Sequence, residues 1–168
     1  MKNLFLSAIV VGATAVSCGT VQSIVQNTFP YTANVLVSTG VPANQEVTST
    51  STASNVQTWM GGNNNAQIKN VRIADAKINV VSGNDLSALK SVKVYISSSG
   101  AGEKLVASRS DISTSGNSVT LDLNDTSYLD NIVKSSDLNV RTVYVLRNQV
   151  TQDTNLRVSL NFSSVPAN

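Results

Sequence analysis

Residues 91–97 read SVKVYIS, and this stretch predicts the fold most directly. Its apolar side chains alternate with lysine, tyrosine and serine: Val92, Val94 and Ile96 on one side, and Lys93, Tyr95 and Ser97 on the other. Successive side chains of a strand point to opposite faces, so the pattern predicts a strand with one face in a core. The glycine-containing loop 98–102 and a second strand over 104–112 complete a predicted hairpin.

The same period of two recurs on both sides of this hairpin. Further strands are predicted over residues 29–41, 68–81, 119–123, 138–147 and 154–163. Residues 45–54 (QEVTSTSTAS) form either a polar edge strand or a solvated loop, and threonine at alternate positions favours the edge strand. Together these segments indicate seven or eight strands.

Two segments depart from simple alternation. In 68–81 the apolar residues change parity near Ala74 and Asp75, which predicts a bulge or a bend at that point. Residues 124–136 contain the one predicted helix of the domain, with Ser127 and Asp130 resembling a capping box. Its expected apolar face consists of Tyr128, Leu129, Ile132 and Val133.

These elements predict an all-β fold, an antiparallel β-sandwich that is immunoglobulin-like or jelly-roll-like, with the short helix before the last two strands. A parallel α/β fold is excluded because its strands need crossover helices, which the sequence does not contain. We expect one domain over 29–168, preceded by a tether over 18–28 and a signal peptide over 1–17.

Composition excludes several classes of function. The chain has no histidine and one cysteine, which rules out Cys/His zinc sites, Ser-His-Asp catalysis and an internal disulfide. Charged residues make up 13% and the net charge is +2, too little to predict a nucleic-acid partner. We therefore expect no enzyme activity, no cofactor and no nucleic acid.

The one cysteine, Cys18, directly follows an apolar N-terminal segment, which is the position of the lipidated cysteine in lipoproteins. Lys2 and the apolar run 4–16 have the form of a signal peptide, and this run is too short to span a membrane. The sequence Ala15-Val16-Ser17-Cys18 resembles the bacterial lipobox, although Ala15 stands where the motif usually has leucine. The alternative is an ordinary secretory signal followed by a buried free cysteine. The resemblance implies that Cys18 carries acyl chains and holds the protein to a membrane.

The residues after Cys18 indicate which membrane and which leaflet the resemblance implies. Gly19 stands where an aspartate marks inner-membrane retention in many lipoproteins, which implies the outer membrane. Residues 19–23 lack the acidic cluster that resembles a surface-export tag, so the periplasmic leaflet is favoured over the cell surface.

Candidate contact residues are few. Trp59 precedes two glycines and the asparagines Asn63, Asn64 and Asn65, and it either fills the end of the core or stacks on a ligand such as a sugar. Tyr95 points outward from its predicted strand and would join the same ligand site.

The polar residues with the most oxygen ligands are Asp122, Asn124 and Asp125, but they lack the glycine and the distal glutamate of a calcium loop. We expect no metal there, because aspartate and asparagine also end a strand and begin a helix. Arg141, Arg147 and Arg157 would share one face if the last two strands pair, either as solvated residues or as an anion-binding patch.

The order of segments from 68 to 162 resembles that of small β-sandwich lipoproteins of Bacteroidota. The matching features are IKNVRI at 68–73, LKSVKVYIS at 89–97, a short helix at 128–134, and strands at 138–146 and 154–162. The resemblance implies a β-sandwich lipoprotein of the outer membrane and brings no activity with it.

The expected function is a structural or accessory role in the cell envelope, through another envelope protein. The polar edge over 45–54 is the expected contact, by addition of a strand. The alternative is a sugar- or peptide-binding module that uses Trp59, Tyr95 and the asparagine loop.

Overall fold

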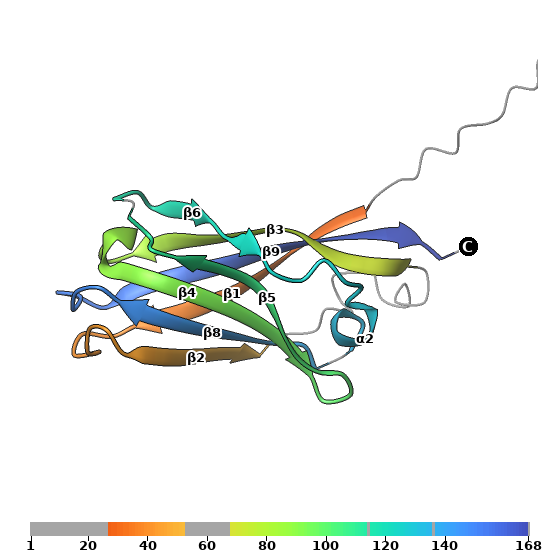
Figure 1. The fold of residues 1–168 in the computed structure, drawn as a ribbon, viewed down its shortest axis with the longest axis horizontal. Coiled ribbons are helices and arrows are strands. Elements are labelled where there is room, and N and C mark those ends of the chain that lie inside the picture. Colours follow the sequence, from red (N-terminus) through yellow and green to blue (C-terminus); the bar gives the residue numbers. More distant parts are fainter. Residues whose placement is uncertain (1–26, 53–67, 114, 136, 168) are drawn as a thin grey trace, which may run out of the picture.

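The protein is an antiparallel sandwich of two β-sheets. A computed structural model describes residues 27–52, 68–113, 115–135 and 137–167 (Figure 1). The first sheet has the order β1 (Asn27–Val37), β9 (Thr154–Pro166), β3 (Ile68–Ser82) and β6 (Ser118–Thr120). The second has the order β2 (Glu46–Thr52), β8 (Asn139–Leu146), β4 (Leu89–Ser98), β5 (Gly102–Ser110) and β7 (Asp122–Leu123). The expected all-β antiparallel sandwich is confirmed.

The pairing of strands distinguishes the two expected sandwich types. β1 pairs with β9, β2 with β8, β3 with β6, and β4 with β5, so the chain forms one long antiparallel ribbon that is rolled up. Rolling adds the cross-pairs between β3 and β9 and between β4 and β8. This is a jelly roll. An immunoglobulin-like sandwich would hold its first two strands in one sheet, whereas β1 and β2 lie in different sheets.

The core lies between the sheets and is built from alternate strand residues. In β9 the inward side chains Leu156, Val158, Leu160 and Phe162 are all buried. Phe162 also stacks on Phe29 of β1, with ring centroids 5.7 Å apart. The change of parity predicted near Ala74 is present, because the β3–β9 register shifts between Ile73 and Asp75. The bulge lets side chains on both sides of it point into the core.

One predicted strand is divided between the two sheets. The alternation over residues 119–123 predicts a single strand, but β6 pairs with β3 in one sheet and β7 pairs with β5 in the other. Leu121 lies between them, 3% exposed, and its N–H donates to the carbonyl of Ala76 at 2.8 Å. This segment therefore closes one side of the sandwich, and the single-strand prediction is wrong because alternation does not show a change of sheet.

The helix is shorter than expected. The sequence predicts a helix within 124–136, whereas α2 covers Asp130–Val133, and a 3-10 turn covers Leu86–Ala88. The predicted capping box is wrong, since α2 has no side-chain cap. The Asp130 carboxylate instead accepts from the backbone N–H of Val71 on β3 at 3.0 Å. Asp125, not Asp130, accepts from the N–H of Ser127.

Leu121→Ala should destabilise the fold by about 2–5 kcal/mol, because it removes a buried side chain from the closing segment. Leu123→Ala is the matched control: Leu123 is 37% exposed and its truncation should cost below about 1 kcal/mol. Urea unfolding of the two variants measures this difference. Equal losses would show that the segment does not close the core.

Candidate functional site

Among the described strands, β2 is an edge strand of the second sheet. Its seven residues pair antiparallel with β8, from Glu46 opposite Val145 to Thr52 opposite Asn139. Among the described strands, none is hydrogen-bonded to the other side of β2, which ends the strand order of its sheet. Of the two interpretations of residues 45–54, the edge strand is confirmed over Glu46–Thr52. In Figure 1 this strand lies along the lower border of the molecule.

The other described edges carry features that hinder strand addition, and β2 does not. β6 has three residues and β7 has two, and very short edge strands offer little ladder. β1 contains Pro30, which has no N–H to donate. After Glu46, the β2 sequence VTSTST holds no charge, proline or glycine. No described strand pairs with this edge, and the residues after Glu46 do not hinder the addition of another extended chain.

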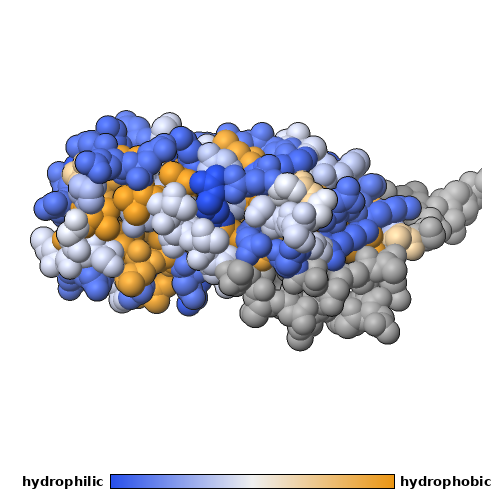
Figure 2. Space-filling view, turned by 90° about the horizontal axis from the view of Figure 1, so that it is seen from below, coloured by the Kyte–Doolittle hydropathy of each residue, from blue (hydrophilic) through white to orange (hydrophobic). Residues whose placement is uncertain are grey.

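The side chains of β2 are small on both faces. Thr48 and Thr50 are exposed on the outer face, while Val47, Ser49 and Ser51 are half-buried on the inner face. Ser49 lies opposite Thr142 of β8, which is 1% exposed and whose Oγ1 has no hydrogen-bond partner among the described residues. The otherwise apolar inward face of β8 thus carries, within the described residues, one unpaired buried hydroxyl next to β2. Figure 2, viewed from the side where β2 lies, shows apolar surface between polar side chains.

Beside this edge, the outer face of the second sheet is held by ion pairs. Lys93 Nζ lies 3.0 Å from Glu46 Oε1, and this hydrogen bond raises the pKa of Lys93. Arg141 donates through Nε to Glu103 at 2.8 Å, and this bond lowers the pKa of the Glu103 carboxyl. The Arg141 guanidinium also lies 4.2 Å from the centroid of the Tyr95 ring. One side of Tyr95, a predicted ligand contact, is thus occupied by arginine.

A small pocket lies next to α2. It has a volume of about 100 Å³ and is lined by Ala101, Lys104, Tyr128, Leu129, Asn131 and Ile132. Lys104 Nζ donates to Ser127 Oγ at 2.8 Å and lies 3.3 Å from Asp125 Oδ2. Hydrogen bonds from Ser127 and then from Lys104 lower the pKa of Asp125. The lysine that lines the pocket is therefore already paired.

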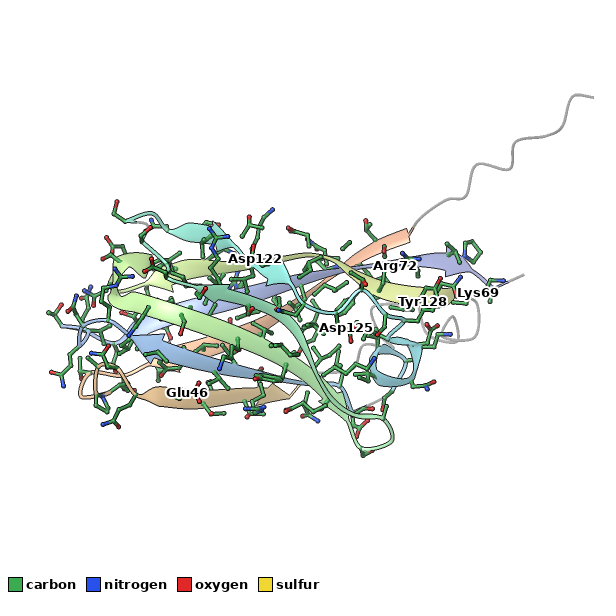
Figure 3. All side chains as sticks on the ribbon, in the orientation of Figure 1. Glu46, Lys69, Arg72, Asp122, Asp125 and Tyr128 are labelled. Atoms are coloured by element: carbon green, nitrogen blue, oxygen red, sulfur yellow. The ribbon has the colours of Figure 1, made fainter. Side chains whose placement is uncertain are left out.

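Tyr128 at this pocket is a candidate contact that the sequence does not reveal. The sequence pattern assigns it to the buried face of the expected helix, but it is 55% exposed and precedes α2. The Arg72 guanidinium lies 5.2 Å from its ring centroid, and the two side chains are close together in Figure 3. The apolar spacing of residues 128–133 predicts a buried Tyr128 only if Tyr128 is helical. The helix α2 begins at Asp130, so Tyr128 lies outside it and its exposure is not apparent from the sequence.

The aspartates of the oxygen-rich stretch have separate cationic partners. Asp122 lies 3.2 Å from Arg109 Nη1, and Asp125 lies beside Lys104. Figure 3 shows the two carboxylates apart from each other. Within the described ranges, no group of three or more histidine, cysteine, aspartate or glutamate side chains is placed to hold a metal ion.

The three arginines do not share a face. The expectation requires β8 and β9 to be neighbours, and they lie in different sheets. Arg141 pairs with Glu103, and Arg147 pairs with Asp111 at 3.0 Å. The shared-face prediction is wrong because the alternation within two strands does not reveal which sheet each one joins.

The remaining predicted site residues, Cys18, Trp59, Asn63 and Asn64, lie outside the described residues. No helix in the part of the chain that the structure describes is long and apolar enough to cross a bilayer.

Comparisons with known proteins give loose similarities of fold. No protein-family profile matches the sequence, and no curated protein matches it. A chain of empty-head turnip yellow mosaic virus matches with a TM-score of 0.36 and 10% identity, covering 100% of this chain and 92% of its own. A chain of desmodium yellow mottle tymovirus matches with a TM-score of 0.29 and 12% identity, covering 99% and 97%. At these values the similarities carry no inference about function.

The carboxylate of Asp137 holds the β4–β5 loop, which contributes Ala101 to the pocket. Ser135 Oγ donates to it, and the N–H of Ser99, at the start of the β4–β5 loop, donates at 2.7 Å. The hydrogen bonds from Ser135 and Ser99 lower the pKa of Asp137 to about 2.

A lowered folded-state pKa gives stability that is present above the ordinary carboxyl pKa of about 3.9 and is lost as the pH falls toward the folded value. We expect the urea midpoint of the native protein to fall between about pH 5 and pH 2, and to fall less in Asp137→Asn. An unchanged pH dependence in the variant would contradict this role of Asp137.

Proposed function

We propose that this protein is a lipoprotein of the outer membrane, attached through Cys18, which acts by contact with another envelope protein and not by catalysis. The observation that carries the proposal is the open edge of β2, which is seven residues long and free of blocking residues after Glu46. Strand addition at such an edge obtains affinity from main-chain hydrogen bonds and needs no deep pocket.

The attachment rests on the N-terminal sequence. Cys18 is the one cysteine of the chain and follows Ala15-Val16-Ser17 in the manner of a lipobox. A single acyl chain holds a protein to a bilayer only marginally, whereas several chains hold it stably. Gly19 after the cysteine supports the outer membrane, and the lack of an acidic cluster over residues 19–23 supports its periplasmic leaflet.

The absence of catalysis is supported by the chemistry of the described side chains. The chain has no histidine, and Asp122, Asp125 and Asp130 each pair with a basic side chain. Carboxylates engaged in this way stabilise the fold and do not form the converging pair that glycoside hydrolysis uses.

A second candidate function is the binding of a sugar or a peptide. The pocket beside α2 and the exposed ring of Tyr128 favour it, because exposed aromatic rings stack on apolar faces of ligands. Titration with oligosaccharides, followed by the chemical shifts of Tyr128 and Asn131, distinguishes this function from a purely structural one.

The attachment is tested by Cys18→Ala. The variant should leave the membrane fraction and appear in the soluble envelope fraction, because it lacks the residue that carries the acyl chains. Ser23→Ala, a small change outside the lipobox, should stay with the membrane. Recovery of the mature Cys18→Ala protein, cleaved of residues 1–17, in the membrane fraction would contradict attachment through this residue.

A further inference from the structure

We propose that the partner at the open edge is a second copy of this chain, with β2 pairing antiparallel to β2 about a twofold axis at Ser49. The two five-stranded sheets would then join into one continuous sheet. This inference rests on the proposed function, because attachment to one membrane brings copies together at a high effective concentration.

The sequence of β2 complements itself in this register. Thr48 lies opposite Thr50 of the second copy on the outer face, and Thr–Thr pairs stabilise antiparallel strands. On the inner face Val47 lies opposite Ser51, and the two Ser49 residues face each other. Glu46, the one charged residue of the strand, lies opposite Thr52, so no like charges meet. Two copies of β2 can therefore pair in this register without repulsion between like charges. A different protein with a complementary charge is not required.

The ion pair next to the edge is compatible with the pairing. Glu46 is already bound to Lys93 on the outer face, so neither charge has to lose a partner when the edge is covered. Exposed Thr48 and Thr50 present short side chains, which leave room for the backbone of the second strand. By contrast, Pro30 removes one donor from the β1 edge.

The symmetry also suits a common membrane. The twofold axis of two antiparallel strands in one sheet is perpendicular to that sheet. Both β1 strands, which begin at Asn27, would therefore start at equal heights above a membrane parallel to the sheet. A chain of nine residues, the length of 18–26, spans at most about 30 Å, which sets the greatest distance at which each Asn27 could lie from its own anchor.

The register is tested by disulfide formation in the outer membrane of cells that make the full chain. With Cys18 acylated, Ser49→Cys supplies the one free thiol of the protein. Opposed residues of antiparallel strands have Cα atoms about 4.5–5.5 Å apart, within the range of a disulfide. Ser51→Cys is the matched control, because the two copies of position 51 would be about 13 Å apart.

The edge is tested by two double variants made in the Ser49→Cys chain. Thr48→Lys/Thr50→Lys places lysine opposite lysine twice, whereas Thr48→Lys/Thr50→Glu places lysine opposite glutamate twice. Both pairs of substitutions are at exposed positions, but Thr50 lies opposite Arg141 of the same chain, so the dimers are compared under conditions where urea unfolding curves show both variants fully folded.

The proposal predicts a reducible dimer with Ser49→Cys and no dimer with Ser51→Cys. The lysine–lysine variant should lose the Ser49→Cys dimer, and the lysine–glutamate variant should keep it. A photo-crosslinking residue at position 50 tests the alternative, in which a different envelope protein binds the β2 edge. An adduct of any mass other than the dimer, with no Ser49→Cys dimer, would overturn the second copy and leave the proposed function in place. The absence of both dimer and adduct would overturn both the second copy and the contact at β2, while attachment through Cys18 has its own test.

Discussion

The pairing of β9 with both β1 and β3 is the constraint on which the rest of the structure depends. β9 lies between the two strands, with β1 in register from Asn27 to Val37 and β3 joined through three register shifts. Its inward residues, including Leu160 and Phe162, are buried in the core. The first strand, β1, pairs with the last strand, β9. The sheet can therefore form only after segments at opposite ends of the domain come into contact. Folding of this topology is therefore expected to be slow, as for other β-folds rich in distant contacts.

The rolled ribbon has two different sides. On one, the chain passes from β6 to β7 and joins both sheets, with Leu121 buried at the crossing. On the other, β1 and β2 end their sheets without a hydrogen-bonded strand between them among the described residues. Among the described strands, the topology that buries the core thus leaves a strand edge unpaired, and the uncharged side chains of β2 after Glu46 do not obstruct it.

Local alternation predicts most of the fold, and non-local choices account for the errors. Residues 91–97 and the β9 segment are recognisable because one face of each strand is buried. The bulge before Asp75 is visible as a change of parity. The crossing at Leu121 and the hydrogen bond from Val71 to Asp130 depend on distant segments, so no local pattern reveals them. In the candidate site, the threonines of β2 predict the edge strand, but nothing local predicts the cover that Arg141 places on Tyr95.

The proposed contact edge accounts for part of the composition, because β2 carries small polar side chains such as Thr48 and Thr50 on an exposed face. The central proposal is that a partner strand covers β2 when the protein is attached to a membrane through Cys18. Amide hydrogen exchange of residues 47–52 tests this, by comparing the lipidated protein in outer-membrane vesicles with the same protein dispersed as monomers in detergent. The account predicts slower exchange of these amides in the membrane, and equal exchange in both states would contradict it.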